Sequence, residues 1–348
     1  MTTPLVVIDA DVLGRRRTGD ETYVAGLLRE LAGSEDLTLA AVTRRPELVP
    51  AGIEPVELTA RSQILRMAVR LPRLLRRLRP ALAHFQHALP LACPSPAVVT
   101  IHDLSFEREP TLMGLGERLI FRSVVPRAAR LAARVIAVSE LTKRDLIELY
   151  GIPGEKIVVI PNGVDPRFRA DGPRPAGDYA LVVGALQKRK DPQAAIEALA
   201  LLGNGKLRLV FAGPDRGGRT EAERAAERVG LRDRVDFRGY VSQDELAELY
   251  RGAACLVFPS RYEGFGLPAL EAMASGTPVV ATTAGALPEV AGDAAILVGE
   301  RDPAAIAGGI ERALADRDRL VRAGLERARL YTWAETARRT LAVYRELL

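Results

Sequence analysis

The chain has 348 residues, of which 48% are hydrophobic and 27% are charged. This balance is typical of folded globular proteins and excludes disordered and fibrous classes. The formal net charge is +5, and the basic residues are five lysines and 44 arginines. Because aromatic residues make up only 5% of the chain and do not alternate with the basic ones, no nucleic-acid partner is expected.

Two features of the sequence bear on its compartment. Cys93 and Cys255 have neither metal-ligand nor redox spacing, which favours a reducing environment. No run of about 18 apolar residues occurs, so we expect no membrane span. Residues 1–10 enter an apolar run without a basic flank or a cleavage pattern. We therefore predict a cytoplasmic protein.

Short β-branched runs alternate with longer amphipathic segments along the whole chain, which is typical of parallel sheets covered on both faces. A chain of this length also exceeds a single core. We therefore expect an α/β protein with two doubly wound parallel-sheet domains that face a central cleft, where the strand ends bind ligands. The predicted strands are residues 5–9, 39–43, 97–101, 134–138, 157–160, 179–183, 207–212, 254–258, 278–282 and 294–298.

Residues 165–178 contain three prolines and two glycines without apolar periodicity, which predicts a linker. The boundary is placed near residue 170, with an N-terminal domain over residues 1–169 and a C-terminal domain over residues 170–325. Residues 326–348 have helical spacing of apolar residues from Trp333 onward. We expect this closing segment to pack back on the N-terminal domain.

Residues 61–79 combine an apolar stripe with a basic stripe at helical spacing. The favoured interpretation is a surface helix that packs on its own sheet with its arginines in water. The alternative is peripheral contact with the inner face of a membrane, because a basic amphipathic helix can lie on anionic lipid. The apolar stripe is Ile64, Ala68, Leu71, Leu75 and Leu78, and the basic stripe is Arg66, Arg70, Arg73 and Arg77.

All three histidines lie in the first half of the chain. His102 and Asp103 directly follow the predicted strand 97–101, at the end where parallel sheets bind ligands. A single histidine is more often structural, but this position favours a functional one. His84 and His87 are assigned to another loop, where His87 would shape an acceptor pocket. Without a nearby cluster of acids, three histidines predict no metal site.

Residues 182–192 place Gly184 and then the bases Lys188, Arg189 and Lys190 after the strand at 179–183. Three consecutive bases are ordinarily a solvated turn. At the carboxyl end of a strand they can instead stabilise a diphosphate leaving group, whose negative charge grows as its bond breaks. We favour Arg189 and Lys190 for this role.

Residues 260–282 place two glutamates in an otherwise largely apolar stretch. Glu263 lies on a loop with Gly264 and Gly266, and Glu271 is assigned to the first turn of a helix that starts near Pro268. Each acid alone is ordinarily a solvated or dipole-complementing charge. Together they predict a sugar-nucleotide site, because carboxylates accept hydrogen bonds from polyols while amides at a helix start bind a diphosphate.

The segment "EGFGLPALE" resembles the Glu-x7-Glu motif of the retaining family 4 glycosyltransferases, which have the GT-B fold of two Rossmann-like domains. "GTPVVATTAGALPEVAGDAAILV", "IPNGVD", "VVTIHDLSF" and "AVSELTKRDL" are similar to further motifs of that family, in the same order. The resemblance implies that Glu263 contacts the donor hexose and Glu271 the ribose. It also implies that amides of Gly264, Phe265, Gly266 and Leu267 face the hexose and phosphates, and that His102 points into the reaction centre.

The chain departs from the family pattern at two places. Residues 15–31 resemble the first glycine loop, which in the family usually has two glycines before an aromatic residue. In this stretch only Gly19 precedes the aromatic residue, and Asp20 and Glu21 follow it. We assign Gly19 to the acceptor side with His87 and Asp103. Ala185 stands where the family often has an arginine. With alanine at this position the chain resembles a subgroup that is rich in mannosyl- and rhamnosyltransferases. This resemblance favours GDP-mannose as the donor.

We therefore predict a retaining, metal-independent hexosyltransferase without a cofactor. Its substrates would be a nucleoside-diphosphate sugar and a hydroxyl of a glycan or lipid-linked acceptor. His102, Glu263, Arg189 and Lys190 are the expected catalytic residues, and Gly184 and Glu271 join the donor site. The alternatives are a sugar-nucleotide or glycan-binding paralogue without turnover, and a GT-B synthase or phosphorylase acting on a storage sugar.

Overall fold

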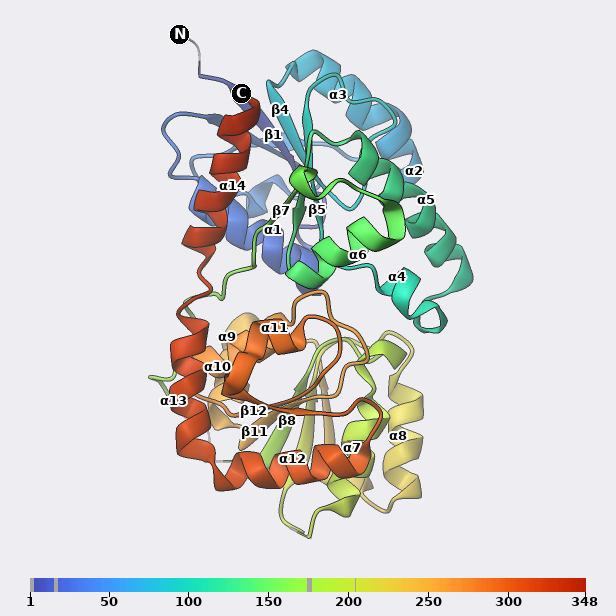
Figure 1. Cartoon of the computed structure of the whole chain (residues 1–348), viewed down its shortest axis with the longest axis vertical. Coiled ribbons are helices and arrows are strands. Elements are labelled where there is room, and N and C mark those ends of the chain that lie inside the picture. Colours follow the sequence, from blue (N-terminus) through green and yellow to red (C-terminus); the bar gives the residue numbers. More distant parts are fainter. Residues whose placement is uncertain (1–2, 16–17, 174–176, 204) are drawn as a thin grey trace. The chain divides into compact units, whose positions relative to one another are not determined.

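The computed structural model describes residues 3–15, 18–173, 177–203 and 205–348. The chain forms two compact units, each a parallel sheet with helices on both faces (Figure 1). Unit 1 comprises residues 1–163 and 333–348, and unit 2 comprises residues 164–332. The α/β class and the two Rossmann-like domains expected from the sequence are thereby confirmed.

The seven strands of unit 1 have the order β3-β2-β1-β4-β5-β6-β7. They are β1 (Leu5–Asp9), β2 (Thr38–Thr43), β3 (Glu54–Glu57), β4 (Leu82–Gln86), β5 (Ala97–Ile101), β6 (Arg134–Ala137) and β7 (Ile157–Val159). The helices are α1 (Thr18–Leu31), α2 (Gln63–Leu65), α3 (Leu71–Leu78), α4 (Ser105–Arg108), α5 (Leu115–Leu131), α6 (Glu140–Tyr150) and α14 (Trp333–Leu347), with a π-helical turn η2 (Arg66–Arg70) and the short 3₁₀ turns η1 (Pro46–Leu48), η3 (Pro110–Leu112) and η4 (Gly154–Lys156).

Alternating residues of the central strands supply two cores in unit 1. Val6 and Ile8 of β1 face α1 and α14, whereas Val7 between them faces α3, α5 and α6. This alternation follows from the pleat of a strand, in which successive side chains point to opposite faces. The strands therefore had to be apolar throughout, which is why they were recognisable in the sequence.

The six strands of unit 2 have the order β10-β9-β8-β11-β12-β13. They are β8 (Tyr179–Val183), β9 (Arg208–Ala212), β10 (Val235–Gly239), β11 (Cys255–Phe258), β12 (Val279–Thr282) and β13 (Ala295–Val298). The helices are α7 (Pro192–Leu201), α8 (Arg219–Arg228), α9 (Gln243–Gly252), α10 (Leu267–Ala274), α11 (Leu287–Ala291), α12 (Pro303–Ala315) and α13 (Arg317–Ala328), with 3₁₀ turns η5 (Lys188–Lys190), η6 (Arg232–Arg234) and η7 (Gly292–Ala294).

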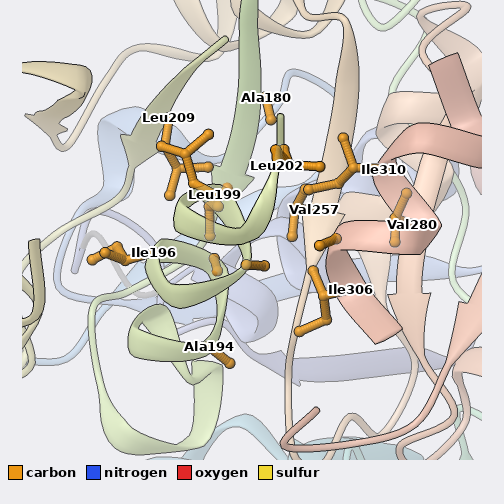
Figure 2. Close-up of a cluster of buried hydrophobic side chains, with 14 of the residues drawn as sticks. Ala180, Ala194, Ile196, Leu199, Leu202, Leu209, Val257, Val280, Ile306 and Ile310 are labelled. Atoms are coloured by element: carbon orange, nitrogen blue, oxygen red, sulfur yellow. The ribbon is translucent and has the colours of Figure 1, made fainter. Parts of the chain in front are cut away.

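Side chains from α7 and α12 pack against the strands of unit 2 (Figure 2). Leu199 of α7 and Ile310 of α12 are 1% exposed and share a core with Val257 of β11. Burial of this kind contributes about 25 cal/mol per Å² of apolar surface. It gives the loops at the strand ends a rigid support.

The structure corrects the expected boundaries between the domains. The division falls between Gly163 and Val164, not near residue 170, and residues 326–332 stay with unit 2. The Val164 N–H donates to the Tyr331 carbonyl oxygen at 3.0 Å. This hydrogen bond joins the first and last segments of unit 2, next to the two points where the chain passes between the units. The predicted linker is also partly structured, because Phe168 is buried with its ring edge-on to Tyr250. Residues 174–176 of that segment lie outside the described residues.

The last helix, α14, belongs to unit 1 and packs against α1. A Cβ atom on Gly26 of α1 would lie 2.4 Å from the Trp333 ring, so the contact needs a glycine there. Tyr344 reaches the middle of the sheet, where its hydroxyl is 2.6 Å from His84 Nδ1.

Residues 61–79 form α2, η2 and α3 and pack on the sheet of unit 1. Leu71 and Leu75 are in the core, so this part of the apolar stripe covers the protein itself. Arg66 does not lie on a solvated basic face, because it is fully buried and its guanidinium donates to Asp9 at 2.5 and 2.9 Å. No helix within the described parts of the chain has the length and apolarity needed to cross a membrane.

Candidate functional site

The strand order of unit 2 reverses its direction between β8 and β11: β9 and β10 lie on one side of β8, and β11, β12 and β13 lie on the other. β8 and β11 are neighbours in the sheet but lie far apart in sequence. In doubly wound sheets the crevice at such a turning point is where ligands bind. The loop after β8 carries residues 184–191, and the loop after β11 carries residues 259–266. These are the two loops that the sequence analysis selected.

Glu263 forms ion pairs with both predicted cations, and Lys190 also donates a hydrogen bond to its carboxylate. Lys190 Nζ lies 2.6 Å from Glu263 Oε1, and Arg189 Nη1 lies 3.3 Å from Glu263 Oε2. Burial, the largest single influence, raises the pKa of Glu263, but the charges of Lys190 and Arg189 together hold it below its ordinary value. Glu263 is therefore an ionised, buried carboxylate placed between two cations.

A second set of contacts joins the same two loops. Arg261 Nε donates to Asp191 Oδ2 at 2.8 Å, and the Arg261 N–H donates to the Arg189 carbonyl oxygen at 2.9 Å. Asp191 is buried and has φ of +44°, a left-handed conformation that non-glycine residues adopt at a cost. Sequence reasoning missed this pair, since nothing in either segment alone shows that their loops meet.

Glycines shape the backbone around these side chains. Gly266 has φ of +104° and stands at the N-terminus of α10. Gly285 has φ of +63°, and a Cβ there would lie 2.1 Å from the Glu263 carbonyl oxygen. That oxygen accepts a hydrogen bond from the Ala286 N–H at 2.8 Å. The backbone of Glu263 is thus held from the β12–α11 connection.

The other residues assigned to the donor lie on the same loops. Gly184 has φ of +130°, and a Cβ there would be 3.1 Å from Lys190 Cε. Phe265 packs edge-on to Tyr331, with ring centroids 5.9 Å apart. The predicted donor-facing residues at the start of α10 are all buried: Gly264, Phe265, Gly266 and Leu267.

Glu271 is the fifth residue of α10, so its assignment to the first turn is wrong. Its carboxyl group is buried rather than aligned with the helix start, and it accepts a hydrogen bond from the Tyr250 hydroxyl at 2.8 Å. Burial raises the pKa of Glu271 to about 7, and the charge of Asp165 adds to the rise. Glu271 therefore changes charge near neutral pH.

This pKa predicts a pH-dependent affinity for nucleotides. Because the pKa of Glu271 in the folded protein lies above its ordinary 4.5, the folded state binds more protons than the unfolded state between about pH 4.5 and 7. The free energy of unfolding therefore falls as the pH rises through this range. The family resemblance implies that Glu271 accepts from a ribose hydroxyl, and the ionised carboxylate is the stronger acceptor. Only about one tenth of the group is ionised one pH unit below its pKa. We expect nucleoside diphosphates to bind more tightly at pH 8 than at pH 6.

Isothermal titration calorimetry in buffers of different ionisation enthalpy measures both the affinity and the proton release on binding. Glu271→Gln should remove most of the pH dependence, and Glu245→Gln, which changes an exposed acid on α9, should keep it. Equal affinities of the unchanged protein at pH 6 and pH 8 would contradict the assignment.

In unit 1, His102 directly follows β5 and contacts residues from two other elements. Its Nε2 lies 2.9 Å from Gln86 Oε1, a hydrogen bond in which Nε2 is the donor in the tautomer that leaves the lone pair on Nδ1. The Tyr23 ring of α1 meets the imidazole edge-on at 4.8 Å. Burial lowers the pKa of His102 to about 4, so the ring is neutral at neutral pH. It can accept a hydrogen bond from a sugar hydroxyl.

His84 does not lie in a loop as expected, because it is a fully buried residue of β4. Its Nδ1 is 2.6 Å from the Tyr344 hydroxyl and its Nε2 is 2.8 Å from Thr100 Oγ1. Thr100 Oγ1 lies 3.0 Å from the Tyr23 hydroxyl. His84 is therefore a structural histidine that connects α14 and α1 through the sheet, and Tyr23 extends this network to His102.

The three residues assigned to the acceptor side have different surroundings. Gly19 is an exposed residue in the first turn of α1, so the expected loop is a helix start at this position, and residues 16–17 lie outside the described part. Asp103 Oδ1 accepts from the Ser105 N–H and hydroxyl at 2.9 and 2.7 Å. His87 has φ of +57°, and its Nε2 lies 3.7 Å from Asp20 Oδ1. An acidic residue, Asp20, therefore lies near His87, although the sequence showed no cluster of acids close to the histidines.

Two Rossmann-like units, each built on a parallel sheet, are the architecture of GT-B proteins. Residues 17–168 match the family model "Glycosyltransferase Family 4", and residues 164–329 match "Glycosyl transferases group 1". Together the two matches span residues 17–329. The chain belongs to the family 4 glycosyltransferases.

Relatives and solved structures agree with this family. The chain is 36% identical over 282 residues to a D-inositol 3-phosphate glycosyltransferase of Acidothermus cellulolyticus, a match that covers 73% of this chain and 62% of that protein. The chain thus spans less than two thirds of the length of this curated relative.

Two solved structures cover almost the whole chain. Sucrose-phosphate synthase from Thermosynechococcus elongatus has a TM-score of 0.80 at 22% identity, over 99% of each chain. Anabaena HepE in complex with UDP-glucose has a TM-score of 0.78 at 19% identity, over 99% of this chain and 100% of that one. Both likenesses support the same fold.

Proposed function

We propose that the chain is a retaining glycosyltransferase that moves a hexosyl group from a nucleoside-diphosphate sugar to a hydroxyl acceptor. The observation that carries the proposal is the ionised Glu263, buried between Lys190 and Arg189 at the β8–β11 switch. Carboxylates accept hydrogen bonds from sugar hydroxyls, and the adjacent cations suit a diphosphate. Glu271, deeper in α10, would accept from the ribose.

In this proposal catalysis rests on positioning and electrostatics. Lys190 and Arg189 would stabilise the charge that gathers on the departing diphosphate. The acceptor would attack from the face that the leaving group vacates, and a phosphate oxygen would take the acceptor's proton. His102, neutral and with Nδ1 available to accept, would orient the sugar. No step calls for a metal ion, so we expect transfer to persist in excess chelator.

The donor and acceptor are proposals of the same kind. The subgroup resemblance at Ala185 favours GDP-mannose, and the UDP-glucose complex of Anabaena HepE supports UDP-sugars as further candidates. A glycan or lipid-linked alcohol is the proposed acceptor, and the inositol 3-phosphate named for relatives is a further one to examine. Peripheral membrane contact by residues 61–79 stays a prediction. It would depend on exposed Arg70, Arg73 and Arg77, because Leu71 and Leu75 are in the core.

A donor screen tests the proposal directly. Hydrolysis of UDP-, GDP- and ADP-sugars is followed by nucleotide release, and then transfer to a panel of glycan, lipid-linked and phosphorylated-polyol acceptors is measured with the productive donor. We expect one nucleotide class to be hydrolysed and its sugar transferred with retained anomeric configuration. Binding of a donor without any release over long incubation would instead support the binding paralogue, and sugar release that needs only inorganic phosphate would support a phosphorylase.

A further inference from the structure

Three metal-ligating side chains meet in unit 1 although they lie far apart in sequence. They are Asp20 in the first turn of α1, His87 directly after β4, and His102 directly after β5. One ligand atom of each lies within 4.8 Å of the others. The sequence predicts no metal site because Asp20 is 67 residues from His87, and only the pairing of β4 with β5 and the position of α1 bring them together.

Two imidazoles and one carboxylate form a ligand set that binds Zn²⁺ and other late first-row divalent ions. Asp20 Oδ1 already lies 3.7 Å from His87 Nε2, and the rings of His87 and His102 have centroids 5.0 Å apart. A tetrahedral zinc ion with bonds of about 2.1 Å separates its ligand atoms by about 3.4 Å. Side-chain rotations that bring the ligand atoms closer by at most about 1.4 Å therefore suffice.

The surroundings of the cluster suit a cation. Gln86 accepts from His102 Nε2, which leaves the lone pair of the other ring nitrogen for an electrophile, as partners of metal-ligating histidines commonly do. His87 is held in a left-handed backbone conformation that costs about 1 kcal/mol, and such strain gathers at functional positions. The negative charges of Asp20 and Asp103 both act on the two histidines.

We propose that Asp20, His87 and His102 bind one Zn²⁺ ion or a similar divalent transition-metal ion. A bound ion would occupy a nitrogen of His102, the ring that orients the sugar in the proposed transfer, so the metal would act as an inhibitor and not as a cofactor. The inhibitory part rests on the proposed function. The binding part does not.

Metal binding is tested on full-length protein without an affinity tag, after treatment with a chelator. Titration with Co²⁺ should give one equivalent of bound ion and the visible d–d bands of a nitrogen–oxygen site, which Zn²⁺ should abolish by displacement. Asp20→Asn and His87→Ala should each weaken binding at least 100-fold. Cys93→Ser is the matched control, because this half-buried thiol is the other soft ligand with access to solvent, and it should bind like the unchanged chain.

Three readouts decide the outcome. A thiolate charge-transfer band, or full Co²⁺ binding by His87→Ala, would overturn the site, as would the absence of stoichiometric binding by the unchanged protein. Zn²⁺ should also raise the melting temperature of the unchanged protein and of Cys93→Ser but not of Asp20→Asn, which reports on the site even if no donor is ever turned over. If transfer is found, low Zn²⁺ should inhibit it reversibly with chelator, and undiminished transfer at saturating Zn²⁺ would overturn the inhibitory role alone.

Discussion

Lys190→Ala should lower the rate constant of sugar transfer by about 100- to 1,000-fold, the usual effect of removing one preorganised stabiliser of developing charge. Lys190 Nζ makes the closest charged contact of Glu263 and also lies 4.7 Å from the centroid of the Phe258 ring. Its loss removes a cation from the diphosphate and leaves Glu263 with Arg189 as its remaining predicted cation. Stopped-time transfer assays with saturating donor measure the effect on the chemical step.

The same loop supplies the matched control. Lys188 belongs to the same 3₁₀ turn as Lys190 but is exposed. If the loss of rate in Lys190→Ala depends on the position next to Glu263 and not on net charge, Lys188→Ala should change the rate less than about twofold. Lys190→Arg separates charge from geometry and should recover only part of the rate. Circular dichroism checks that each variant is folded. Full activity of a folded Lys190→Ala would remove Lys190 from the proposed mechanism.

Gly285→Ala should eliminate nucleotide-sugar binding although Gly285 has no functional group. Its φ of +63° is unfavourable for alanine, and the added Cβ would lie 2.1 Å from the Glu263 carbonyl oxygen and 2.7 Å from its nitrogen. Both atoms are backbone and cannot rotate away, so the loop that carries Glu263 must move. We expect a loss of about 3 kcal/mol or more in stability, in line with severe overpacking combined with backbone strain.

Gly217 provides the comparison for this variant. It also has positive φ, +84°, but a Cβ there meets nothing within 4 Å, so Gly217→Ala carries only the strain of about 1–2 kcal/mol. Urea unfolding followed by far-ultraviolet circular dichroism measures both variants. The single tryptophan, Trp333, lies in unit 1 and its fluorescence transition serves as an internal reference. Equal losses in the two variants would show that the contact with Glu263 does not matter.

Much of the fold could be predicted from the sequence because buried parallel strands are apolar on both faces. All ten predicted strands occur, and three were missed: β3, β4 and β10. The missed strands carry polar residues, such as His84 in β4, whose imidazole is satisfied by partners from α14 and β5. A polar residue with distant partners gives no local sign that it belongs to a core.

The sequence by itself indicated the candidate site residues that lie within one loop: Gly184 with Arg189 and Lys190, and Glu263 with Gly266. It placed Glu271 in the first turn of α10, whereas Glu271 is the fifth residue of that helix. The chemistry of these residues is local, since a glycine loop, a run of bases and a helix start are recognisable from adjacent residues. Tertiary structure decided which of these residues meet. It placed Lys190 against Glu263 and Arg261 against Asp191, and it brought Asp20 to His87 and His102. Such contacts depend on strand order and on helices returning from distant segments, which residue spacing along the chain does not contain.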